Sequence, residues 1–73
     1  MKDSEGRTLF LVAGVSLKEG DDGRIHCHYK ASAIYSFSAE LAENWLLDAL
    51  KKDAPDCDKY DTQVAELTIE TIQ

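Results

Sequence analysis

Hydrophobic and polar side chains alternate along two long stretches in the first half of the chain. Between residues 8 and 17, the apolar odd positions are Leu9, Leu11, Ala13, Val15 and Leu17. Phe10 and Val12 make this stretch apolar on its other side as well. Residues 24–37 alternate in the same way, with one side formed by Ile25, Cys27, Tyr29, Ala31, Ala33, Tyr35 and Phe37. Alternation with period 2 predicts strands over residues 8–17 and 24–37, joined by a hairpin turn at Asp22-Gly23.

The spacing of apolar residues becomes helical after Ser38. The apolar positions then follow i, i+1, i+4, i+5, i+8 and i+9, and are Leu41, Ala42, Trp45, Leu46, Ala49 and Leu50. Ser38 is a favourable N-cap, and Pro55 ends the helix because the residue before a proline avoids helical geometry. The sequence therefore predicts an amphipathic helix over residues 39–53. An acidic loop and a last strand over residues 62–72 follow it.

The order strand, strand, helix, strand restricts the topology. The helix carries the chain back across the sheet, so the third strand runs parallel to the second. Placing it beside the first gives the order 2-1-3, with only antiparallel pairs and a right-handed crossover. The predicted fold class is α+β, with one helix packed on one face of a three-stranded antiparallel sheet. We expect a single small domain over residues 1–73, with residues 1–7 disordered.

One helix covers only one face of this sheet. We expect it to cover the face of the odd-numbered residues and to bury Trp45, together with Cys27, Tyr29, Tyr35 and Phe37. The uncovered face would then carry the apolar residues Phe10, Val12, Ile34, Val64 and Ile72. Contiguous exposed apolar surface often marks an interface. We therefore expect this face to bind a second copy of the chain or a larger protein partner, with Phe10→Asp as the test.

The charge is uneven along the chain. The 73 residues include 14 acidic and 8 basic ones, a net charge of −6. Residues 1–37 hold five of each sign, so residues 38–73, with nine acids and three bases, contain the whole excess. A direct nucleic-acid binder needs a basic surface, and a hydrophobic content of 44% excludes a disordered acidic tail.

The acidic residues of the second half are candidates for a partner-binding surface. They are Glu40, Glu43, Asp48, Asp53, Asp56, Asp58 and Asp61. A short acidic single-domain chain of this kind resembles, in composition, the small inhibitors encoded by phages and mobile elements, such as anti-CRISPR and other DNA-mimicking anti-defence proteins. The resemblance implies a protein that occludes a basic nucleic-acid-handling partner by imitating phosphates. The alternatives are a homodimeric regulatory or accessory subunit that uses the open sheet face, and a solvated face that keeps the protein soluble.

Residues that could perform chemistry are few. In a strand, His26 and His28 point to the same side, and Cys57 or Asp58 could complete a zinc site with them. A metal-binding module is therefore a minor alternative. The four aspartates between residues 53 and 61 match no calcium loop, and the chain has no nucleophile or phosphate-loop motif. We predict a protein that is not an enzyme and has no catalytic residues, no metal site and no cofactor.

Targeting signals are weak. The apolar stretch of residues 9–17 is too short to span a membrane, which takes about 20 residues. Asp3 and Glu5 disrupt the positive leading region of a signal peptide. Two cysteines do not form a disulfide framework. We therefore expect a cytoplasmic protein with no membrane partner.

Overall fold

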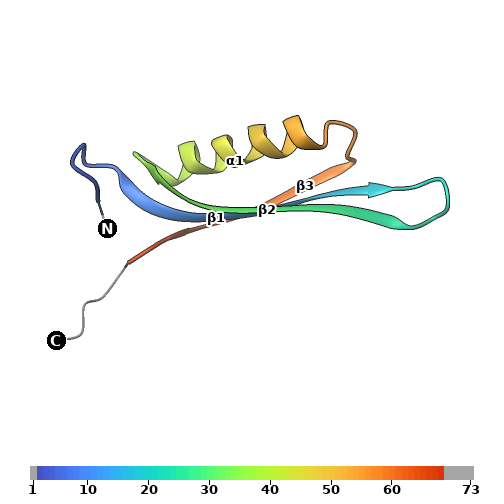
Figure 1. The fold of residues 1–73 in the computed structure, drawn as a ribbon, viewed down its shortest axis with the longest axis horizontal. Coiled ribbons are helices and arrows are strands. Elements are labelled where there is room, and N and C mark those ends of the chain that lie inside the picture. The colour runs from blue at the N-terminus through green and yellow to red at the C-terminus, as the bar shows by residue number, and fades with distance from the viewer. Residues whose placement is uncertain (1, 69–73) are drawn as a thin grey trace.

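The fold has two layers, a sheet and one helix (Figure 1). The computed structural model describes residues 2–68. Its elements are β1 (Thr8–Glu19), β2 (Ile25–Ser36), α1 (Ala39–Asp53) and β3 (Lys59–Glu66). The strands lie in the order β2-β1-β3, and both pairs are antiparallel. The predicted α+β fold and strand order are confirmed.

The β1–β2 hairpin closes where the Asp-Gly pair predicts it. Gly23 has a φ of 78°, a value that favours glycine. The Asp22 carboxylate accepts a hydrogen bond from the Arg24 N–H at 3.0 Å, which holds the turn. The hairpin extends past the end of α1, so its tip carries no helix layer (Figure 1).

Several segments differ from their predicted bounds. Strand β1 ends at Glu19 rather than 17, β2 covers Ile25–Ser36 rather than 24–37, and β3 ends at Glu66 rather than 72. Strand β3 begins at residue 59 rather than 62, because the Asp58 N–H donates to the Leu17 carbonyl at 2.9 Å and brings the acidic loop into the sheet. Residues 2–7 form a hydrogen-bonded turn where the sequence predicts disorder. Partial burial raises the pKa of Asp3, but hydrogen bonds from the Arg7 N–H and guanidinium outweigh it, and that pKa lies below its usual value.

Hydrogen bonds define both ends of helix α1. Ser38 is its N-cap and accepts a hydrogen bond from the Leu41 N–H at 3.1 Å. At the other end, the Tyr60 hydroxyl of β3 donates to the Ala54 carbonyl at 2.6 Å. The first contact caps the helix, and the second joins its C-terminal end to β3.

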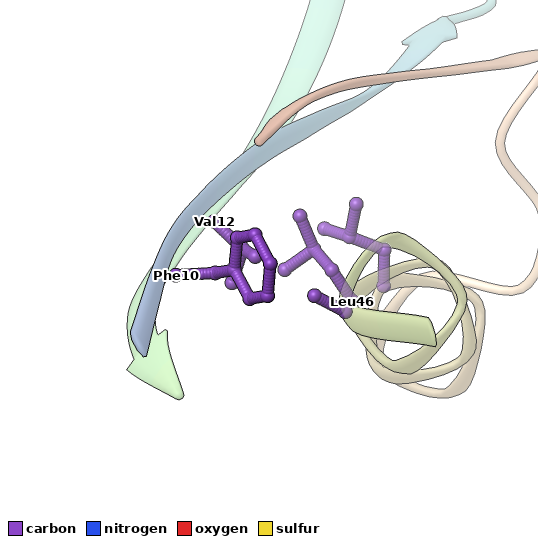
Figure 2. Packing of buried hydrophobic residues seen from close by; sticks show 5 residues of the cluster. Phe10, Val12 and Leu46 are labelled. Atoms are coloured by element: carbon purple, nitrogen blue, oxygen red, sulfur yellow. The ribbon is translucent and has the colours of Figure 1, made fainter. Parts of the chain in front are cut away.

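The helix covers the face of the even-numbered residues. Figure 2 shows Phe10 and Val12 of β1 pointing toward Leu46 of α1. The buried cluster consists of Phe10, Val12, Ala42, Leu46 and Leu50, and Ile34, Tyr60 and Val64 pack against it. The prediction that Phe10, Val12, Ile34 and Val64 lie on the uncovered face is therefore wrong. The fifth residue of that prediction, Ile72, lies outside the described residues.

Small residues on β1 explain why the helix lies on this face. The buried side of the strand continues from Val12 to Gly14 and Ser16. A Cβ at Gly14 would lie 2.7 Å from Cδ1 of Leu50 and 3.0 Å from Cδ2 of Leu46. Glycine thus gives the two leucines of α1 the space to reach the strand.

The aromatic side chains predicted to be buried are exposed instead. Tyr29, Tyr35 and Phe37 retain 73%, 40% and 67% of their accessible surface, and Cys27 is also exposed. Trp45 is 44% exposed, because α1 buries the i, i+4, i+8 line of Ala42, Leu46 and Leu50. The predicted burial of Cys27, Tyr29, Tyr35 and Phe37 is wrong because the helix covers the opposite face of the sheet.

Candidate functional site

The sheet face opposite α1 is apolar and carries no described element (Figure 1). We call it the open sheet face. Its side chains come from alternate positions of all three strands, because successive residues of a strand point to opposite faces. Its residues are Leu9, Leu11, Ala13, Val15, Leu17 and Glu19 of β1, Ile25, Cys27, Tyr29, Ala31, Ala33 and Tyr35 of β2, and Lys59, Asp61, Gln63 and Ala65 of β3.

The strand register places these side chains in rows across the sheet. Ala13 lies between Ala31 of β2 and Gln63 of β3. The next row along the sheet has Leu11 between Ala33 and Ala65. The middle of the open sheet face is therefore built mainly from alanine, and larger side chains lie beside it.

The relief of this face, meaning its raised and hollowed parts, depends on the size of the side chains. Along β2, Tyr29 and Tyr35 stand on either side of the alanines at 31 and 33. Two shallow hollows lie along β1 and β3, with volumes of about 220 and 320 Å³. Both are lined by Ala13 and Gln63, and the smaller one extends to Tyr29 and Asp61. The open sheet face thus has a ridge on β2 and a trough beside it.

Charge is scarce on this surface. Among the open-face residues given above, only Glu19 at the hairpin end of β1 and Lys59 and Asp61 of β3 are charged. Ile25 and Leu11 are 60% and 45% exposed. An apolar, nearly neutral surface of this kind is suited to burial against another protein surface.

The predicted acidic residues do not form one surface. All seven are exposed, but Glu40, Glu43 and Asp48 lie on α1, whereas Asp61 lies on the open sheet face. Asp53 forms an ion pair with Lys30 at 3.2 Å. The structure therefore divides this set between the two sides of the sheet and the loop that connects α1 to β3. The proposed binding of a basic partner stays a prediction.

His26 and His28 share one side of β2, as predicted. They line a hollow of about 230 Å³ together with Cys57, Asp53 and Asp56. The imidazole of His26 turns toward the hairpin, where its Nε2 lies 3.9 Å from an Asp22 carboxylate oxygen. Within residues 2–68, no group of three or more His, Cys, Asp or Glu side chains is arranged to hold a metal ion.

An apolar sheet face is exposed, as predicted, but it is formed by other residues than the predicted ones. Its missed members, Leu11, Tyr29 and Ala33 among them, are the odd positions assigned to the core from the sequence. The useful signal is Gly14, whose missing side chain leaves the space that Leu46 and Leu50 of α1 occupy. The exposed side then follows from the alternation.

Comparisons with protein-family models, with curated proteins and with solved structures find no match for this chain. The described part of the chain contains no helix long and apolar enough to cross a membrane. The site is therefore interpreted from its own geometry.

Proposed function

We propose that this chain is a non-enzymatic protein-interaction module that binds its partner through the open sheet face. The observation that carries the proposal is the row of leucine, valine, alanine and tyrosine side chains over all three strands, which α1 leaves uncovered. At about 3.3 Å per residue, the 12 residues of β1 are about 40 Å long. Three strands spaced by about 4.8 Å are about 14 Å wide.

The size of this surface supports an interface. Because β3 has only 8 residues, the three strands together give a footprint of about 500 Å², within the upper part of the range for the largest apolar patch of a monomeric protein, which is often functional. Burying apolar surface stabilises a complex without directional contacts and with little dependence on salt. The proposed contact is therefore strongest in its apolar centre, around Ala13.

The acidic residues support a second candidate function, an occluding inhibitor of the phage-encoded kind that the composition resembles. Glu40, Glu43 and Asp48 are exposed on α1, and a basic nucleic-acid-handling protein would be the partner. Such a contact depends on charge and weakens steeply as salt rises. The geometry gives it less support, because Lys51 and Lys52 lie on the same helix.

Site-specific photo-crosslinking in lysates of the cells that make the protein, adjusted to low or high salt, tests the proposal. A photoreactive residue replaces Ala31 on the open sheet face, and in a matched control it replaces Asp48 on α1. Both positions are exposed, so either side chain can report on a neighbour. We expect adducts from position 31 in both low and high salt.

Two results of the crosslinking decide between the candidates. Adducts of defined mass from position 31 that persist in about 0.5 M salt, where screening extends only a few Å, support the open sheet face. Adducts from position 48 alone, lost in high salt, contradict it and support the charged contact. Absence of adducts from position 31 under every condition also refutes the proposal.

A further inference from the structure

We propose that the partner of the open sheet face is a second copy of this chain, packed sheet on sheet about a two-fold axis. The inference rests on the proposed function and names its partner. It joins four observations: the area of the face, its relief, the placement of its charges and the small size of the core.

The area matches what a stable dimer needs. A footprint of about 500 Å² on each copy gives at least about 1,000 Å² buried by two copies, since a corrugated sheet has more accessible than projected area. A specific interface buries at least about 1,000 Å² in total. Two sheets pack about 10 Å apart through interdigitated side chains, as in a β-sandwich.

The relief of the face is self-complementary. An axis that runs along the strands places β2 of each copy over β3 of the other. Because this axis keeps each row of the strand register in place, Tyr29 of one copy then lies over Asp61 of the other, at the edge of the smaller hollow, and Ala31 and Ala33 lie over Gln63 and Ala65. This arrangement brings the Tyr29 hydroxyl of each copy toward the Asp61 carboxylate of the other, where a buried tyrosine finds an acceptor.

The charges of the chain do not oppose this arrangement. A net charge of −6 on each copy would repel a second copy if the acidic residues met. Glu40, Glu43 and Asp48 lie on α1, on the far side of the sheet. With about 10 Å between the sheets and about 10 Å from each sheet to its helix, the two helices are about 30 Å apart, beyond the Debye length of about 8 Å.

The small core supplies the reason for a second copy. The buried hydrophobic residues of the described chain are Phe10, Val12, Ala42, Leu46, Leu50 and Ala54. A domain below about 70–80 residues rarely obtains more than about 3–5 kcal/mol from its core, and oligomerisation is one of the usual additions. Two-fold homodimers are the commonest oligomers. Packing two open faces together turns a two-layer fold into a four-layer one with a second core.

Sedimentation equilibrium of the purified chain tests the inference, over a roughly hundredfold range of concentration. We expect a mass of twice 8.1 kDa that falls toward 8.1 kDa on dilution. Ala33→Arg places a charge in the centre of the proposed interface and is expected to give monomer throughout. Tyr29→Ala removes half of the ridge and is expected to weaken association at least tenfold.

The matched control is Leu41→Arg, which introduces the same charge at an exposed leucine of α1 and should leave the dimer intact. Circular dichroism checks the fold of each variant. Ala33 and Tyr29 are exposed on an edge strand, so we expect both variants to fold. If Ala33→Arg does not fold, Tyr29→Ala still tests the interface.

Three outcomes overturn the inference. The first is a wild-type chain that stays at 8.1 kDa at every concentration. In that case, crosslinks from position 31 to a protein of another mass would still support the proposed function. A dimer that neither variant weakens indicates pairing at a strand edge instead. A dimer lost in Leu41→Arg but not in Ala33→Arg indicates association through α1, and refutes the proposed function as well.

Discussion

Two leucines of α1 provide a direct test of which side of the helix faces the sheet. Leu46 is fully buried and Leu41 is 55% exposed, although the two lie only five residues apart in the same helix. Replacing each with alanine removes the same atoms and changes helix propensity by the same small amount. The difference between the two variants therefore reports burial.

The expected magnitudes follow from that burial. Truncating a fully buried leucine lowers the free energy of unfolding by about 2–5 kcal/mol, because a cavity remains. Burying a whole leucine contributes about 1.5–3 kcal/mol, so Leu41, with less than half of its surface buried, should contribute about 1 kcal/mol. We expect Leu46→Ala to be the less stable variant by at least about 1 kcal/mol.

Urea denaturation followed by circular dichroism measures this difference. Each variant is compared with the wild-type chain at one protein concentration, since any association makes stability depend on concentration. Equal losses in the two variants, or a larger loss in Leu41→Ala, would refute the assignment of the Leu46 side of α1 to the sheet.

Three further substitutions test the packing on this face. Gly14→Ala should lower the free energy of unfolding by about 1–3 kcal/mol, because its Cβ overlaps Leu50; an unchanged urea midpoint would contradict this. Ser16→Ala should raise it by about 1 kcal/mol, since the buried hydroxyl has no hydrogen-bond partner among the described residues, and a lower thermal midpoint would count against this reading. Ser38→Ala should lower it by about 1 kcal/mol through loss of the N-cap, measured as lost helical signal on heating.

The order of elements could be predicted from the sequence because each depends on local signals. The alternation of residues 8–17, the Asp22-Gly23 turn and the Ser38 cap each have a local physical cause, and each lies where it was predicted. The topology follows from those elements, since few arrangements of three strands and one helix avoid a left-handed crossover.

The covered face could not be read from hydrophobicity, because β1 is apolar on both sides. Five apolar odd positions outweigh Phe10 and Val12 in any count of apolar residues, yet the helix packs on the side with fewer of them. Close approach at Gly14 decided the packing, and it depends on where Leu46 and Leu50 of α1 meet the strand. This tertiary contact joins residues more than 30 positions apart, beyond the range of local pattern.

The same choice of face changed the candidate site. Phe10→Asp, proposed from the sequence as a test of the exposed surface, would place a charge in the buried cluster and unfold the chain. Ala33→Arg now takes its place. The acidic residues were predicted correctly as exposed, but their division between two faces follows from the strand register at Asp61 and the ion pair of Asp53 with Lys30.

The central claim, that the open sheet face is buried against a second copy, can be measured through the two cysteines. Cys27 lies exposed on that face and Cys57 is half-buried in the loop on the other side. Alkylation rates of both thiols are determined by mass spectrometry over a concentration series. We expect Cys27 to react more slowly than Cys57 in concentrated protein. Dilution, or the Ala33→Arg substitution, should raise the reaction rate of Cys27. A rate for Cys27 that is the same at every concentration and in Ala33→Arg would contradict the central claim.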